Sequence, residues 1–184
     1  MHMIQYVKFF NPDQDDHRPI DWAKMSDHCM AMIHTDEFLP FWNSLQPPNV
    51  RKELLTKEDE YGFTIAHRIA LEGESKLFIA FWQTLSLEDQ EICACLNARW
   101  GWTVAHCVAR SLDTNTFFLF WNSLSDDLKN HLAIQATHHE EETLGSIIFD
   151  YHVKEFYWFW STLTDETKGI LTHKHEKVKD FLKK

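Results

Sequence analysis

The sequence feature that most constrains the fold is an eight-residue pattern, Phe-x-x-Phe-Trp-x-x-Leu, which occurs four times. Its apolar residues stand at positions i, i+3, i+4 and i+7, the spacing of one face of an α-helix. Successive tryptophans are 40, 39 and 39 residues apart, which marks an internal repeat. Such a period predicts stacked helical units, an architecture that binds other molecules more often than it catalyses reactions. The four copies, called octets below, span residues 38–45, 78–85, 117–124 and 156–163.

Four units of this length nearly fill the 184 residues, so we predict a single all-α domain with no separate catalytic domain. Each unit is expected to hold three helices, because a short amphipathic segment follows every octet. Hydroxyl residues with nearby acids, such as Ser86 with Asp89, are typical of the starts of these third helices. The predicted segments are an N-terminal cap at 1–20, repeats at 21–59, 60–98, 99–138 and 139–172, and a C-terminal cap at 173–184.

The octet side chains are expected to form an interlocking core. Each repeat unit must bury its apolar face against its neighbours, and four copies at a fixed period favour that role. A ligand pocket lined by the same Phe and Trp side chains is the alternative. If the octets are core, recognition is left to the turns that connect the units.

Charge and cysteine usage bound the partners and the compartment. The 18 basic and 28 acidic residues give a formal charge of −10, which argues against nucleic acid and anionic membranes as partners. The chain lacks both a membrane-length apolar run and a secretory signal pattern. The four cysteines have no disulfide-framework spacing and are expected to be buried thiols. We therefore expect a cytoplasmic protein.

Two segments resemble the opening of an ankyrin repeat. They read Gly62-Phe63-Thr64-Ile65-Ala66-His67 and Gly101-Trp102-Thr103-Val104-Ala105-His106, each followed by an alanine three residues later. The ankyrin pattern is Gly-x-Thr-Pro-Leu-His-x-Ala. The resemblance implies that the motif begins the first of two antiparallel helices, with Thr and His hydrogen-bonded at its start.

This sequence departs from the ankyrin pattern in three respects. The proline is absent, and the fourth segment has Ser146 where the histidine is expected. The period is about 40 residues rather than roughly 33, because a third helix replaces the usual hairpin connection. A HEAT-like or armadillo-like array is the structural alternative.

Residues beside the turn glycines are the candidate binding site. The resemblance implies that these turns form the tips of a concave binding face, and aromatic residues are enriched at interaction hot spots. The alternative is that the same side chains pack against adjacent turns. The candidate partner-binding residues are Tyr61, Phe63, Arg68, Arg99, Trp100, Trp102 and Arg110.

The residues that could carry catalysis or bind metal have more ordinary interpretations. His67 and His106 occupy the helix-start position of the motif. The stretch from His138 to Glu142 and the pair His173 and His175 contain metal-ligand residue types but match no known metal-site spacing. We therefore predict no catalytic residue, no cofactor and no metal.

The predicted function is a non-enzymatic module that binds a protein partner. Small proteins with divergent ankyrin-like repeats resemble regulators or bacterial effectors delivered into a host cell. One alternative is a metal-dependent protein or enzyme that uses the His-rich loop near His138. Another is a structural role in which the end units self-associate.

Overall fold

A computed structural model describes residues 22–46, 48–138 and 142–183 of the chain. This part of the chain contains thirteen α-helices and a short 3-10 helix, and it contains no β-strand. The all-α prediction is confirmed. The predicted N-terminal cap at 1–20 lies outside the described residues, as do His139, Glu140 and Glu141.

The helices come in groups of three, each followed by a loop, and one more helix ends the chain. The first group is α1 (Trp22–Met32), α2 (Phe38–Ser44) and α3 (Pro48–Thr56), and the second is α4 (Ile65–Glu72), α5 (Ser75–Trp82) and α6 (Leu87–Cys95). The 3-10 helix η2 (Arg99–Gly101) precedes α7 (Val104–Ser111), α8 (Thr114–Ser123) and α9 (Asp126–Ile134). The last elements are α10 (Leu144–Tyr151), α11 (Phe156–Ser161), α12 (Asp165–Lys174) and α13 (Glu176–Phe181).

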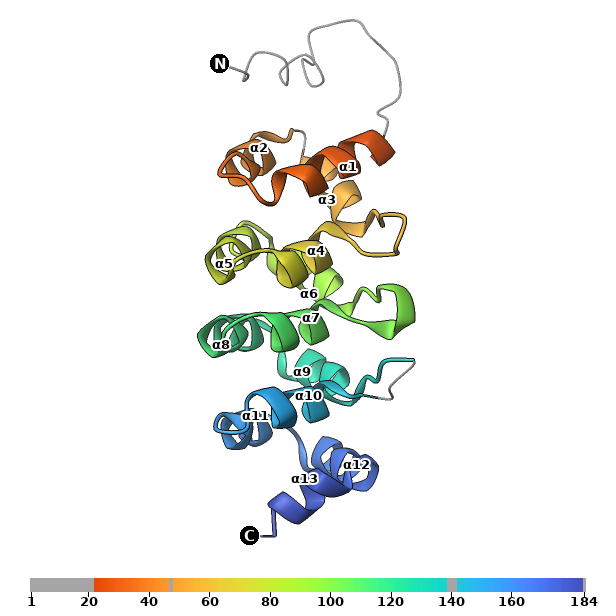
Figure 1. The fold of residues 1–184 in the computed structure, drawn as a ribbon, viewed down its shortest axis with the longest axis vertical. Coiled ribbons are helices and arrows are strands. Elements are labelled where there is room, and N and C mark those ends of the chain that lie inside the picture. Colours follow the sequence, from red (N-terminus) through yellow and green to blue (C-terminus); the bar gives the residue numbers. More distant parts are fainter. Residues whose placement is uncertain (1–21, 47, 139–141, 184) are drawn as a thin grey trace, which may run out of the picture.

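Each group of three helices packs on the next one along the chain (Figure 1). The first helices contact one another in the order α1, α4, α7 and α10, and the octet helices α2, α5 and α8 do the same. The third helices pair as α3 with α6 and α9 with α12. Figure 1 shows the octet helices along one side of the molecule and the loops before α4, α7 and α10 along the other. We call each group a layer.

The octet side chains fill the space between layers. The Phe81 ring lies 6.0 Å from the Phe38 ring and 5.2 Å from the Trp42 ring, both of which belong to the layer before it. The same arrangement recurs where Phe120 meets Phe78 and Trp82, and where Phe159 meets Phe117 and Trp121. Phe81, Phe120 and Phe159 are each 0% exposed. The octets therefore form core, as expected, and the side chains at their repeated Phe, Trp and Leu positions do not line the groove found between α5 and α8 in the described part of the chain.

The tryptophans also join the layers by hydrogen bonds. The indole Nε1–H of Trp42, Trp82 and Trp121 donates to a hydroxyl two residues past the next octet's tryptophan: Thr84 at 3.0 Å, Ser123 at 2.8 Å and Thr162 at 3.0 Å respectively. Each hydroxyl in turn donates to the backbone carbonyl three residues before it. These three buried indoles are thereby satisfied without water. We call this repeated contact the indole ladder.

The Thr and His of the ankyrin-like motif are capping residues, as the resemblance implies. In α4 and α7 the threonine side chain accepts a hydrogen bond from the histidine N–H, and the histidine Nδ1 accepts one from the threonine N–H. This reciprocal arrangement is a capping box. Both histidines also reach the next layer, because Nε2–H of His67 donates to the Trp102 carbonyl and that of His106 to the Gln135 carbonyl, each at 3.1 Å.

The fourth layer replaces the missing motif histidine with one from elsewhere. Thr143 caps α10 by accepting a hydrogen bond from the Ser146 N–H. His175, between α12 and α13, places Nε2 2.8 Å from the Thr143 hydroxyl. An added Cβ on Gly145 would lie 2.8 Å from a methyl group of Leu171, so the Leu171 side chain of α12 packs closely on this glycine.

Two details differ from the sequence-based expectations. Cys95 is exposed, whereas Cys29, Cys93 and Cys107 are buried as expected. Cys95 is the last residue of the short helix α6, where its side chain leaves the core face. Helix α12 continues through Lys174 and so overlaps the predicted C-terminal cap at 173–184.

Candidate protein-binding surface

The candidate site lies on the loops that precede α4, α7 and α10. These loops stack directly on one another. An added Cβ on Gly62 would lie 3.3 Å from the Cβ of Arg99, and the His138 N–H donates to the Trp100 carbonyl at 2.7 Å. Together with the two histidine bonds between layers, these contacts fix each loop against the next. The three loops therefore lie along one side of the molecule (Figure 1), and the first two carry Tyr61, Phe63, Arg99, Trp100 and Trp102.

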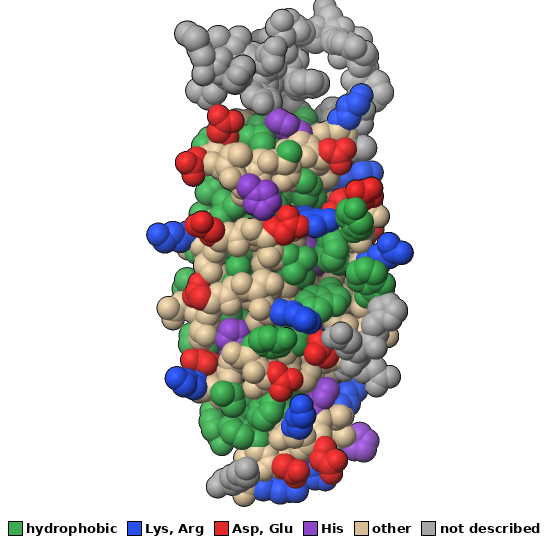
Figure 2. Space-filling model, in the orientation of Figure 1, with side chains coloured by type: hydrophobic (Ala, Val, Ile, Leu, Met, Phe, Trp, Pro, Cys, Tyr) green, Lys and Arg blue, Asp and Glu red, His purple; other side chains and the backbone are tan. Residues whose placement is uncertain are grey.

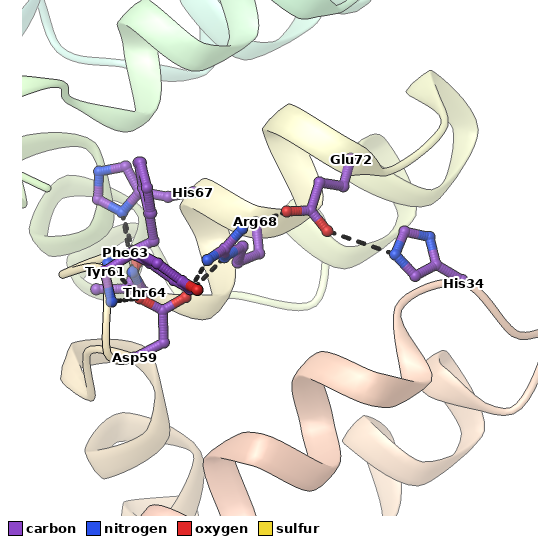
Figure 3. Close-up of polar contacts among 8 residues, drawn as sticks. All are labelled: His34, Asp59, Tyr61, Phe63, Thr64, His67, Arg68 and Glu72. Atoms are coloured by element: carbon purple, nitrogen blue, oxygen red, sulfur yellow. Dashed lines mark hydrogen bonds and ion pairs between the residues drawn. The ribbon is translucent and has the colours of Figure 1, made fainter.

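Asp59 organises the first of these loops (Figure 3). Its carboxylate accepts the backbone N–H of Tyr61 at 2.8 Å and of Phe63 at 2.9 Å, which closes the turn at Gly62. Gly62 has φ +78, a left-handed conformation that glycine adopts without strain. The same carboxylate accepts a hydrogen bond from Nε of Arg68 at 2.7 Å.

Arg68 is committed to contacts within the protein. Its guanidinium pairs with Asp59 and Glu72, and Glu72 also lies 3.4 Å from Nε2 of His34 in the first layer (Figure 3). The guanidinium carbon stands 4.9 Å from the Phe63 ring centre and 5.4 Å from that of Tyr61. The Arg68 side chain is 19% exposed. Arg68 and the half-buried Phe63 therefore support the loop, and of the three predicted site residues here Tyr61 is the exposed one.

The second loop presents Trp100 in a strained backbone conformation. Trp100 has φ +68, and it is the one non-glycine residue with positive φ in the described part of the chain. Gly101 follows with φ +80, and an added Cβ there would lie 2.9 Å from His138. The Trp100 side chain is 44% exposed, and the exposed Arg99 places its guanidinium 5.2 Å from the indole centre. Both residues face outward from the tip.

Arg110 joins the second loop to the fourth layer. Its guanidinium lies 5.1 Å from the Trp102 ring centre and 5.8 Å from that of Tyr151, and its Nη1 is 3.6 Å from the Glu142 carboxylate. Trp102 is half-buried, and its carbonyl is the acceptor for His67. The sequence-based set did not include Tyr151, which ends α10 and is 54% exposed. A lone tyrosine at a helix end carries no sequence signal, because only the stacking brings it to Arg110.

The predicted residues thus fall into two groups. Tyr61, Trp100 and Arg99 are exposed at the tips, and Arg110 is 39% exposed between two aromatic rings. Phe63, Arg68 and Trp102 support them from below. In Figure 2 hydrophobic side chains gather on the loop side of the molecule, with basic side chains beside them. We call the surface formed by Tyr61, Arg99, Trp100, Arg110 and Tyr151 the tip surface.

Other parts of the described chain offer weaker candidates for a binding or catalytic site. A shallow groove of ≈ 330 Å³ between α5 and α8 has Lys76 and Asp113 as its charged lining residues and contains no His or Cys. Among the described residues no three His, Cys, Asp or Glu side chains are grouped to hold a metal ion. His138 is exposed, and the rest of the predicted His-rich loop up to Glu141 lies outside the described residues. Within the described ranges, no helix has the length and apolarity needed to cross a bilayer.

Compared with models of protein families, with curated proteins and with solved structures, the chain has no match. Its function is therefore inferred from its own residues.

Proposed function

We propose that the chain is a non-enzymatic protein-binding module, built as a short solenoid of four ankyrin-like units that recognises a protein partner through the tip surface. The layer-on-layer packing, the two capping boxes and the loop stacking support the solenoid assignment. The proposed cellular role, as an intracellular regulator or as an effector delivered into a host cell, rests on the resemblance to ankyrin repeats alone. No catalytic step forms part of this proposal.

The conformation of Trp100 is the observation that carries the proposal. A left-handed conformation costs a residue with a side chain roughly 1 to 2 kcal/mol, and a glycine at this position would avoid that cost. Gly62 and Gly101 occupy left-handed positions in the same two turns. A bulky indole kept at such a position, and 44% exposed, favours a role for the side chain in binding rather than in folding.

The neighbours of Trp100 make a surface suited to a protein partner. Tyr61 and Tyr151 are 51% and 54% exposed, and aromatic and arginine side chains dominate interaction hot spots. Among the described residues, Arg99 has no carboxylate within salt-bridge distance, whereas Arg68 and Arg110 do. The guanidinium of Arg99 is thus available to donate hydrogen bonds to the carbonyl or carboxylate groups of a partner.

The proposal is tested by crosslinking the full-length chain to its partners in a lysate of its source cells. We compare the wild type with Trp100→Ala and Tyr61→Ala, and we use Leu87→Ala as the matched control. Leu87 is 74% exposed on α6 and lies outside the tip surface. We expect a protein that the wild type and the control retain equally, and that Trp100→Ala retains at least tenfold less. Thermal unfolding confirms that each variant is folded.

Two outcomes would overturn the proposal. One is the absence of any protein that the wild type retains. The other is equal retention by wild type, Trp100→Ala and Tyr61→Ala, which would place binding elsewhere on the molecule.

A further inference from the structure

The octets meet by a fixed rule at every junction between layers. The first and fifth residues of one octet enclose the fourth residue of the next. Phe38 and Trp42 enclose Phe81, and the two following junctions repeat this contact with ring distances between 4.9 and 6.3 Å. The enclosed ring is 0% exposed at all three junctions.

Phe41 is the same fourth residue in the first octet, but no octet precedes it. It is half-buried, and its ring contact in the described chain is with His28 of its own layer, at 5.3 Å. Leu39 and Met30 are also half-buried. Ser44, which occupies the hydroxyl position of the indole ladder, is exposed. Among the described helices, α1 and α2 are the first layer of the stack (Figure 1). Their half-buried apolar side chains include Phe41, at a position that the later octets bury fully.

The chain before α1 contains a partial copy of the octet. Residues 6–11 read Tyr-Val-Lys-Phe-Phe-Asn, which places aromatic residues at the first, fourth and fifth octet positions. Asn11 follows the fifth position as Asn43 and Asn122 do in two of the full octets. Pro12 and Asp13 then replace the hydroxyl residue and the leucine, so the copy stops after its aromatic part.

We propose that Tyr6 and Phe10 pack on Phe41 and close the N-terminal end of the stack. Tyr6 and Phe10 are i and i+4, so one helical turn would present both on the same face. They correspond to the first and fifth octet residues, which enclose the fourth residue of the next layer at every other junction. The face on α2 thereby binds a segment of its own chain and continues the aromatic contacts between layers.

The connecting chain is long enough for this contact. Eleven residues separate Phe10 from the start of α1 at Trp22, and an extended chain of that length spans up to roughly 36 Å. Helix α1 has 11 residues and is about 16 Å long, and α2 packs beside it. Phe41 therefore lies within reach of residues 6–10.

The sharpest test adds a contact rather than removing one. Phe10 lacks the indole N–H that completes the ladder elsewhere, so Phe10→Trp should supply a donor for the Ser44 hydroxyl. We expect this substitution to raise the folding equilibrium constant of the full-length chain about 5-fold in urea denaturation, the usual effect of one net hydrogen bond. The gain should vanish when Ser44→Ala is also present. No gain, or an equal gain without the Ser44 hydroxyl, would overturn the proposal.

Alanine substitutions at the neighbouring Phe9 and Phe10 provide a matched comparison. Phe10→Ala should lower the folding equilibrium constant at least 10-fold, whereas Phe9→Ala, at the outward fourth position, should lower it less than 3-fold. Phe10→Ala and Phe41→Ala should also be non-additive by at least 5-fold, because the two rings would touch. Equal effects of the two alanine variants, or additivity with Phe41→Ala, would contradict the assignment.

The other occupant of this face would be a second copy of the chain. Sedimentation of the full-length wild type distinguishes the two. A monomer whose stability responds to Phe10 supports the intramolecular contact. A dimer that Phe41→Ala dissociates and Phe10→Ala leaves intact would assign the face to self-association and overturn the proposal.

Discussion

At the scale of single residues, the two tryptophans of the second loop have opposite roles. Trp100 is exposed and has a strained backbone, and its indole lies beside the Arg99 guanidinium, whereas Trp102 is half-buried with an ordinary φ of −71. Trp102 also supplies the carbonyl that His67 binds and the ring under Arg110. Stability is therefore expected to depend on Trp102 and binding on Trp100.

A pair of glycine substitutions measures this difference. Trp100→Gly relieves about 1 to 2 kcal/mol of backbone strain but adds flexibility to the unfolded chain, so the free energy of unfolding should stay within about 1 kcal/mol of wild type. Trp102→Gly should lower it by about 2 kcal/mol through lost packing. Urea denaturation checks both, and a large loss for Trp100→Gly would show that its side chain is structural.

The two capping histidines make the stability of the protein depend on pH. Burial lowers the pKa of His67 and of His106 from 6.5 to about 4, and both rings accept a hydrogen bond at Nδ1, which requires the neutral form. The unfolded chain takes up protons below pH 6.5 while the folded chain does not until about pH 4. Their contribution is thus complete above pH 6.5 and is lost as the pH falls towards 4.

We expect the free energy of unfolding to fall by about 2 kcal/mol per histidine between pH 7 and pH 5, at about 1.4 kcal/mol per pH unit below 6.5. Denaturant titrations across this range measure the slope. Replacing His106 with Asn should halve the slope of the free energy of unfolding against pH. An unchanged slope in that variant would mean that other groups govern the acid sensitivity.

At the scale of elements, the octet helices are joined both by ring packing and by the indole ladder. Ser44 is a control for the ladder, because Ser44 and Ser123 each donate to the carbonyl three residues earlier. Among the described residues an indole N–H donates to Ser123 and none donates to Ser44. Removing the Ser123 hydroxyl leaves the Trp82 N–H buried without a partner, and such a loss costs about 1 to 3 kcal/mol.

The comparison of two alanine variants isolates that bond. Ser123→Ala should lower the free energy of unfolding by about 1 to 3 kcal/mol, whereas Ser44→Ala should lower it by less than about 0.5 kcal/mol. Chemical denaturation of both variants is sufficient. Equal losses would indicate that the local hydroxyl-to-carbonyl bond, and not the indole, matters.

At the scale of the whole molecule, each layer contacts mainly its neighbours in the chain. The principal helix contacts join elements of the same or adjacent layers, such as α1 with α4 and α9 with α12. Arrays of this kind behave as a line of units coupled to their nearest neighbours, so a defect at one end should loosen that end first. The free energy needed to unfold one layer is then set mainly by the contacts of that layer and its neighbours.

Hydrogen exchange can detect this locality. Leu171→Ala removes a side chain that is 1% exposed in α12 and should cost about 2 to 4 kcal/mol. Amides in α10–α13 should then exchange at least 30-fold faster, while those in α4 and α5 should be nearly unaffected. The counterpart Leu54→Ala in α3 should loosen α1–α3 and spare α10–α13. Uniform acceleration along the chain would instead indicate one cooperative unit.

Much of the fold could be predicted because its signals are local. The i, i+3, i+4, i+7 spacing of the octets encodes a helix with one apolar face, and that face is buried around Trp42, Trp82 and Trp121. The Thr-x-x-His spacing encodes a capping box that is complete within one helical turn. Repetition of both signals indicated which parts of the chain would be equivalent.

The candidate site was less predictable, because its character depends on contacts between distant residues. The sequence singled out seven residues beside the turn glycines but did not separate exposed Tyr61 and Trp100 from supporting Phe63, Arg68 and Trp102. That division follows from the Asp59 carboxylate and from the loops above and below. No sequence signal linked Tyr151 to Arg110 or His175 to Thr143, because the two residues of each pair are more than 30 positions apart.

By itself the sequence determined the helices, their caps and the faces they bury, since each depends on residues within a turn or two of one another. Only the tertiary structure decided which loop side chains are left exposed and that Trp100 takes a left-handed conformation. The reason is that stacking places each loop against the next and satisfies some polar and aromatic groups while leaving others at the surface. The sequence of one loop does not reveal which groups of the adjacent loop will contact it.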